Sequence, residues 1–254
     1  VEIFNSRVRT IVFFVAAILS AAFGHRHPVA TFLSRPVSTR TISRCKNRGP
    51  RLAYSVAGVD ADVVAEVERQ LGYVPPNLVA VTSRTGRLNS PVALRTYPLN
   101  GGTTRRRSRS RGKLTPFPTL YWLSDPNICR AVADLERRGN VALLEKRLRL
   151  DPAYVKLHLV AHEEYARERW ESLTVDDRAM LEDALTGKGE VGGITAGMVE
   201  MIRSSGIAGR SRPFGPSIKC LHCHYAHYRS GGEDNIVGRW IDELLREEFP
   251  DLDL

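Results

Sequence analysis

The sequence has 254 residues, of which 43% are hydrophobic and 26% are charged. This length suits one or two domains, and the composition is typical of a globular protein, so a chain that is disordered throughout is excluded. The formal net charge of +9 is concentrated in residues 1–50 and 105–113, which hold fourteen of the 37 Lys and Arg residues and only one acid. The remainder is mildly acidic, so the net charge does not by itself indicate a nucleic-acid-binding domain.

The N-terminal region has the pattern of a two-part targeting sequence. Residues 1–22 resemble a signal peptide, because two arginines precede a short apolar run that ends in small residues. Residues 23–55 are rich in Ser, Thr and Arg and contain no acid, as a disordered transit peptide does. We expect both segments to be removed, which leaves no membrane span in the mature protein. Together they predict delivery to the plastid of an alga with secondary plastids, with the secretory pathway as the alternative.

A single globular domain is predicted over residues 60–250. Asp60 is placed to cap a helix that ends at Gly72. Residues 100–114 are predicted to form a disordered, solvated insert, because the run Asn100–Lys113 has no apolar side chain. Three short strands are predicted in this half of the domain, the first two joined as a hairpin, at 78–81, 92–94 and 119–123.

The second half of the domain has apolar residues at helical spacing. Pro126 suits the first turn of a helix that stops at Gly139, and Thr174 opens a variant capping box. Residues 187–197 are predicted to be a loop. Because the strands come before the helices, we expect an α+β fold, with a small antiparallel sheet of about three strands followed by and packed against several helices. The further helices are predicted at 141–148, 152–170, 175–185, 219–228 and 237–249.

Several ordered motifs in this chain resemble those of the DUF501 family, an uncharacterised bacterial and plastid family of unknown function. The resemblance extends over roughly residues 62–245 and implies no established activity. The family typically has a Cys-x-Cys-Gly element in the first hairpin, where this chain has Ser83-Arg84-Thr85-Gly86 and so lacks those cysteines. The Arg/Ser insert likewise replaces a compact loop of the family. The motifs that carry the resemblance are residues 115–126, 135–139, 161–165, 219–222, Ala226-His227 and 235–238.

Potential metal ligands and nucleophiles are densest between Cys220 and His227, which include His222, Cys223 and His224. The three cysteines that remain after Cys45 are too few for a disulfide scaffold. Thiolate and imidazole suit zinc. A zinc site is one prediction, with ligands and a nearby general base drawn from Cys220, His227, His162, His158 and Glu163.

Other interpretations of the same residues stay open. Cys220 is also a candidate nucleophile, activated by His222, His227 or Lys219, because a neighbouring cation lowers a thiol pKa. The run Cys220–His224 also matches the attachment pattern of c-type haem. Alternatively, the thiols pack in the core and the histidines lie at the edge of a helix.

Two functions are therefore predicted as alternatives. In the first, the chain is an enzyme or ligand-binding domain whose pocket is lined by Lys219, Cys220, His222 and His227 from one helix and by His162 and Glu163 from another. In the second it is a non-enzymatic adaptor, and its basic insert binds RNA or an acidic partner. The arginines of that insert are Arg105, Arg106, Arg107, Arg109 and Arg111.

Overall fold

The computed structural model describes residues 58–100, 114–187 and 193–254. The predicted targeting segments and the arginines of the basic insert lie outside these residues. Among the helices of the described part, none is long and apolar enough to cross a membrane.

The predicted α+β architecture is confirmed. The sheet has the order β1-β2-β3 and is antiparallel throughout. Helix α2 precedes it, with Asp60 as N-cap and Gly72 as a left-handed C-cap, as predicted. The bounds are α2 Ala61–Leu71, β1 Leu78–Arg84, β2 Pro91–Thr96 and β3 Tyr121–Leu123.

Helices make up the rest of the described chain, in the order predicted. One helix was not predicted: α8 begins at Ala196, inside the predicted loop 187–197, so the end of that loop prediction is wrong. Thr195 caps the helix by accepting from the Met198 amide. A second difference is that α9 begins at Leu221, so Lys219 and Cys220 precede the helix. The bounds are α4 Pro126–Arg137, α5 Asn140–Arg149, α6 Pro152–Glu171, α7 Val175–Leu185, α8 Ala196–Ser204, the 3-10 turn η1 Ile207–Gly209, α9 Leu221–Arg229 and α10 Ile236–Glu248.

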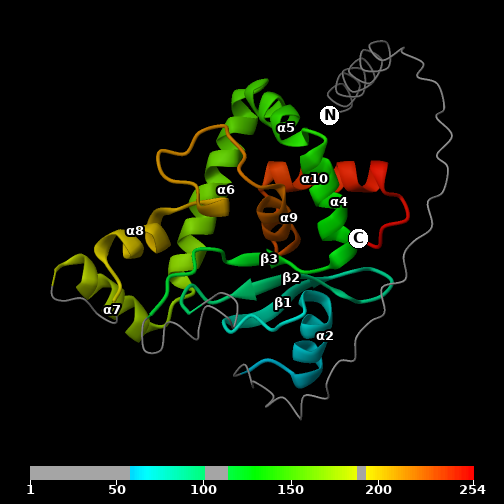
Figure 1. Cartoon of the computed structure of the whole chain (residues 1–254). Coiled ribbons are helices and arrows are strands. Elements are labelled where there is room, and N and C mark those ends of the chain that lie inside the picture. The colour runs from blue at the N-terminus through cyan, green and yellow to red at the C-terminus, as the bar shows by residue number, and fades with distance from the viewer. Residues whose placement is uncertain (1–57, 101–113, 188–192) are drawn as a thin grey trace, which may run out of the picture. The chain divides into compact units, whose positions relative to one another are not determined.

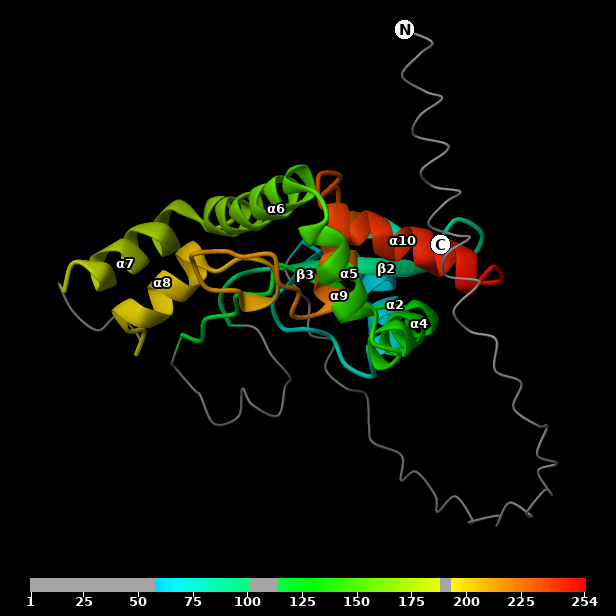
Figure 2. The ribbon, with the colours of Figure 1, turned by 90° about the horizontal axis from the view of Figure 1, so that it is seen from above.

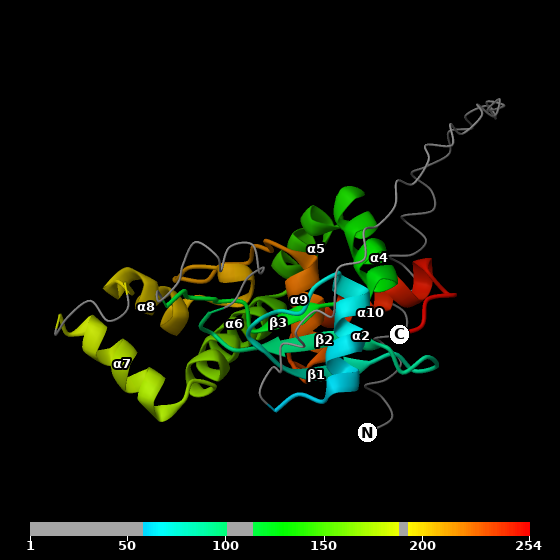
Figure 3. The same cartoon turned by 60° about the horizontal axis from the view of Figure 1, so that its bottom comes forward.

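The sheet is covered on both faces (Figures 1 and 3). On one face Val81, Leu94 and Trp122 lie side by side in the strand register and pack with Val67 of α2. On the other face α9 contacts β2 and β3, and Tyr121 packs with buried residues of α6 and α9. Helix α9 is therefore enclosed between the sheet and the surrounding helices, which explains why its side chains are mostly buried.

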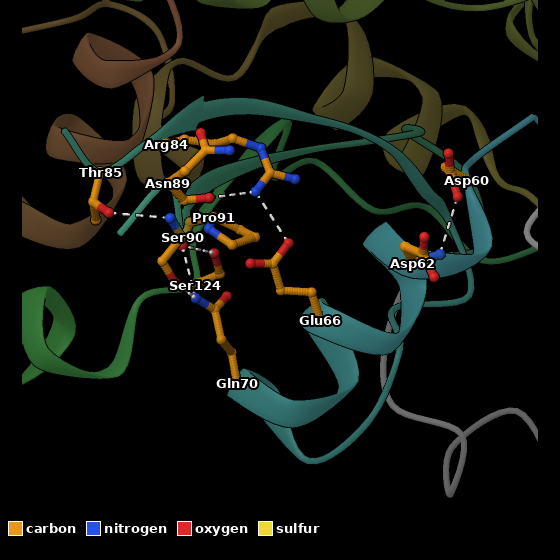
Figure 4. A network of polar contacts seen from close by, with 10 residues as sticks. All are labelled: Asp60, Asp62, Glu66, Gln70, Arg84, Thr85, Asn89, Ser90, Pro91 and Ser124. Atoms are coloured by element: carbon orange, nitrogen blue, oxygen red, sulfur yellow. Dashed lines mark hydrogen bonds and ion pairs between the residues drawn. The ribbon is translucent and has the colours of Figure 1, made fainter. Parts of the chain in front are cut away.

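Polar contacts fix α2 to the hairpin (Figure 4). Arg84 donates to Glu66 at 3.0 Å, and Gln70 donates to Ser90 at 2.8 Å. The Ser90 amide donates to Thr85 Oγ1 at 3.0 Å. The segment that matches the cysteine element of the family thus has a structural role in this chain. It also lies near the C-terminal end of α9, because the Arg84 carbonyl accepts from Arg229 at 3.2 Å.

Helices α7 and α8 form a separate layer beside the end of α6 (Figure 2). Their apolar cluster includes Leu181, Val199 and Ile202, all fully buried. Arg169 of α6 is buried as well and joins this layer to the sheet, because its guanidinium donates to carbonyls of Ile202 at 2.6 Å, Pro118 at 3.0 Å and Ser205.

Candidate functional site

Accessible reactive side chains gather where α9 begins. Cys220 is the N-cap residue, and its side chain makes no capping hydrogen bond. The first amide of the helix, that of Leu221, instead donates to Glu136 Oε1 of α4 at 2.6 Å. A carboxylate here satisfies an amide that has no partner within the helix and is favoured by the helix dipole. Glu136 therefore holds the start of α9 against α4.

The imidazole of His222 lies between Cys220 and α4. Its Nε2 is 3.1 Å from the carbonyl oxygen of Cys129, and since a carbonyl can only accept, we place a proton on Nε2. Nδ1 then faces the Cys220 sulfur at 4.0 Å and Glu136 Oε1 at 3.3 Å. Cys220, with contributions from Glu136 and the Cys129 carbonyl, raises the pKa of His222 to about 9. The nitrogen that can exchange a proton is thus directed at the thiol.

The two thiols at the start of α9, those of the N-cap Cys220 and of Cys223, have pKa values shifted in opposite directions. The neighbouring Cys223 thiol, together with His222 and the Cys223 amide, lowers the pKa of Cys220, although burial opposes the shift. The pKa of Cys223 is raised, first by Cys220 and second by burial. Cys220 is therefore the thiol that ionises first. His222 and Glu136 beside it keep 28% and 29% of their side-chain surface exposed, so solvent reaches the group.

Lys219 and Glu163 were also predicted to be catalytic, but neither is a polar partner of His222 in the described residues. Lys219 is exposed just before the helix and does not touch His222 by any hydrogen bond or ion pair found in the described residues. Glu163 of α6 is also exposed and pairs with Arg212, in a shallow pocket with Phe214. The partners of His222 thus come from α4 rather than from α6.

Four histidines form a buried cluster from α6 and α9. His158, His162 and His224 are fully buried, and His227 is 2% exposed. The Ile207 amide donates to His162 Nδ1 at 3.0 Å, so His162 carries its proton on Nε2 and donates to His158 Nε2 at 3.1 Å. His158 Nδ1 makes no hydrogen bond of ordinary geometry, although nearby backbone carbonyls act on its pKa.

Asn235 fixes the other two rings of the cluster. Its Oδ1 accepts from the Gly238 amide at 3.1 Å, and its Nδ2 donates to the His224 carbonyl at 3.0 Å, which sets the orientation of the amide. Oδ1 consequently accepts from His224 Nδ1, and Nδ2 donates to His227 Nδ1, both at 3.2 Å. Burial lowers the pKa of every ring, to about 3 for His162 and about 4 for His227. All four histidines are neutral near pH 7.

The described residues contain two groups whose potential ligand atoms lie within 4.8 Å of one another. The first is His158, His162 and His224. A metal needs a lone pair from each ring, and His162 has none free, because Nδ1 accepts a hydrogen bond and Nε2 carries the proton. This group therefore fits a network of neutral imidazoles and not a metal site.

The second group is Glu136, Cys220 and His222. Here Nδ1 of His222 is free to ligate, while Nε2–H is held by a carbonyl, as is usual for histidines that bind metals. The residues predicted as zinc ligands do not share one group, since His162 and His227 belong to the buried cluster. The haem interpretation does not fit either, because His224 is fully buried and bonded to Asn235.

A family model described as "Protein of unknown function (DUF501)" matches residues 82–243. The chain belongs to the DUF501 family. No curated protein and no solved structure matches it. The match includes α4, α6 and α9, so the Cys220 site and the buried cluster both lie within the DUF501 region.

Glu136 and Cys129 are the site residues that sequence reasoning missed. Glu136 lies in one of the motifs that carry the family resemblance, but no spacing connects α4 to α9. Cys129 acts through its backbone carbonyl, so its side chain gives no signal. Only the packing of α4 against α9 shows these two contacts.

Proposed function

We propose that this DUF501 protein is an enzyme that uses Cys220 as a nucleophile. The observation that supports the proposal is the orientation of His222, whose Nδ1 is turned toward the thiol while its Nε2–H is held by the Cys129 carbonyl. Glu136, which lies on α4 as Cys129 does, also contacts the His222 ring and helps to orient it. This is the arrangement of nucleophile, base and orienting group on which thiol catalysis depends.

The chemistry begins with a thiolate and an imidazolium. The thiolate of Cys220 attacks an electrophilic carbon or sulfur atom of the substrate, and His222 Nδ1–H returns a proton to the leaving group. The amides of the first turn of α9 favour negative charge at Cys220. The buried histidines take no proton in this scheme, because they are neutral and enclosed.

A comparison of alkylation rates tests the proposal. At about pH 6, well below the ordinary thiol pKa of about 8.5, iodoacetamide should modify Cys220 at least ~10-fold faster in the native chain than in His222→Asn. Peptide mass spectrometry follows Cys220 alone. Cys129→Ala is the matched control, because it removes a side chain and keeps the carbonyl that holds His222, so its rate should equal that of the native chain. Equal rates in the native chain and His222→Asn would rule out activation by His222.

Zinc is the second candidate, because Glu136, Cys220 and His222 also suit this ion in number and type of ligand. Metal analysis of the reduced protein, purified without chelator, separates the two. Near-stoichiometric zinc that is lost in Cys220→Ala would replace the free nucleophile by a zinc site. Metal-free protein with a fast-alkylating Cys220 supports the nucleophile.

Delivery to a plastid and binding of RNA or an acidic partner also remain proposals. They rest on residues 1–55 and 105–111, which lie outside the described residues, and on their composition alone. A fluorescent fusion of residues 1–55 that stays outside the plastid of such an alga would contradict the first. Unchanged RNA affinity after deletion of 103–111 would contradict the second.

A further inference from the structure

The thiol of Cys223 has no part in the function proposed above, yet it lies beside the nucleophile. Cys220 is the N-cap of α9 and Cys223 is its third residue. Helical geometry places such Cα atoms about 5 Å apart, within the range that a disulfide spans.

The two thiols differ in the way that a dithiol couple requires. Cys223 packs against the cluster that includes Leu120, Tyr165 and Ala226. Cys220 lies next to His222 and Glu136, which remain partly exposed. A thiolate beside exposed polar groups can attack an external sulfur, whereas a thiol packed against apolar side chains is held for the second step.

The third cysteine of the described residues does not fit this role. Cys129 Sγ donates to the carbonyl of Leu123 at 3.5 Å. Burial raises the pKa of Cys129 to about 11. Its thiol is therefore protonated and directed toward β3, and only its carbonyl faces His222.

We propose that Cys220 and Cys223 form a redox couple whose substrates are disulfides, with Cys223 as the resolving thiol. This rests on the nucleophile proposed above and names its substrate class. It explains why Cys223 lies next to Cys220 and not elsewhere on α9.

The reaction has two steps. Cys220 thiolate attacks one sulfur of the substrate disulfide, a mixed disulfide forms, and the released thiolate takes the proton from His222 Nδ1. The Cys223 thiol then gives its proton to His222 Nδ1, and its sulfur attacks Cys220. The Cys220–Cys223 bond forms, the mixed disulfide breaks, and the second substrate thiolate takes that proton. The protein loses two electrons and two protons, and the substrate becomes two thiols. A further turnover needs a dithiol reductant.

The test uses dithiobis(nitrobenzoate), an aromatic disulfide whose released thiolate is coloured, on the full chain. Every variant carries Cys45→Ser, because Cys45 lies outside the described residues and would add a background equivalent. The chain that keeps both Cys220 and Cys223, called the native pair, should release two equivalents of the coloured thiolate in a fast phase. Its mass should then show an internal disulfide and no aromatic adduct. Cys223→Ser should release one fast equivalent and retain the aromatic thiol on Cys220. Cys129→Ser should behave as the native pair does.

The results distinguish the Cys220–Cys223 redox couple from the Cys220 nucleophile on which it rests. A fast first equivalent that leaves a stable adduct in the native pair would overturn the redox couple and leave the nucleophile standing. A first equivalent no faster than an ordinary thiol, in the native pair and Cys223→Ser alike, would overturn both.

Discussion

Replacing Arg169 by methionine should lower the free energy of unfolding by about 3 kcal/mol or more, because three backbone carbonyls, two of them buried, lose their donor at once. The guanidinium is fully buried and bonds to carbonyls from α8, the residue after it and the segment before β3. Burial lowers its pKa to about 10, so it remains charged at pH 7. Urea denaturation followed by circular dichroism measures the change.

Arg167→Met is the matched control for this prediction. Arg167 lies on the same helix, is 62% exposed and pairs with Glu171 at 3.6 Å. An exposed pair of this kind contributes at most about 1 kcal/mol. If both variants lose the same stability, the three carbonyl bonds of Arg169 do not hold α6, α8 and the sheet together.

Acid should destabilise the protein strongly between pH 6.5 and pH 5. His162 and His227 have pKa values lowered to about 3 and about 4 by burial, whereas in the unfolded chain they titrate near 6.5. The unfolded chain therefore binds more protons in this range, and stability falls as the pH falls. Below its unfolded pKa each such histidine contributes up to about 1.4 kcal/mol per pH unit, so these two alone should remove about 3 kcal/mol between pH 6.5 and pH 5.

His222 should have the opposite effect on the pH dependence of stability, because its pKa is raised and not lowered. Its folded pKa is raised to about 9, so its contribution is fully present below pH 6.5 and is lost as the pH rises through 9. His222→Asn should therefore leave the acid limb of the stability profile unchanged. A free energy of unfolding that stays constant from pH 7 to pH 5 would show that the buried rings are not neutral as described.

Local signals predicted the order of the fold well. Asp60, Gly72 and Thr174 have the capping roles expected of them, because caps depend on a few neighbouring residues. Helix α8 was missed because it follows a glycine-rich run, and its apolar residues Val199 and Ile202 give a short pattern. The start of α9 was placed too early for a similar reason: Cys220 has the extended backbone of an N-cap, which its residue type does not indicate.

The candidate site was predictable only in part. Sequence reasoning named Cys220 and His222 together as nucleophile and activating group, and the structure brings their side chains into contact. The residues predicted as zinc ligands do not come together in one site. His162 belongs to the buried histidine cluster, where its tautomer is set by a hydrogen bond from the Ile207 amide, and the sequence gives no sign of that bond. The hydrogen bond from Leu221 of α9 to Glu136 of α4 joins residues that are 85 positions apart in the chain. Such a contact has no local pattern in the sequence.

The most direct test of the account is a pH titration of the Cys220 thiolate in the full-length chain, by its ultraviolet absorbance, with Cys220→Ser as the reference. The difference between the two should show a thiolate already formed at pH 7, with a midpoint well below the ordinary thiol value of about 8.5. In His222→Asn the midpoint should move up toward that value. A native midpoint at or above about 8.5 would contradict the claim that Cys223, His222 and the start of α9 lower the pKa of Cys220 and make it a nucleophile.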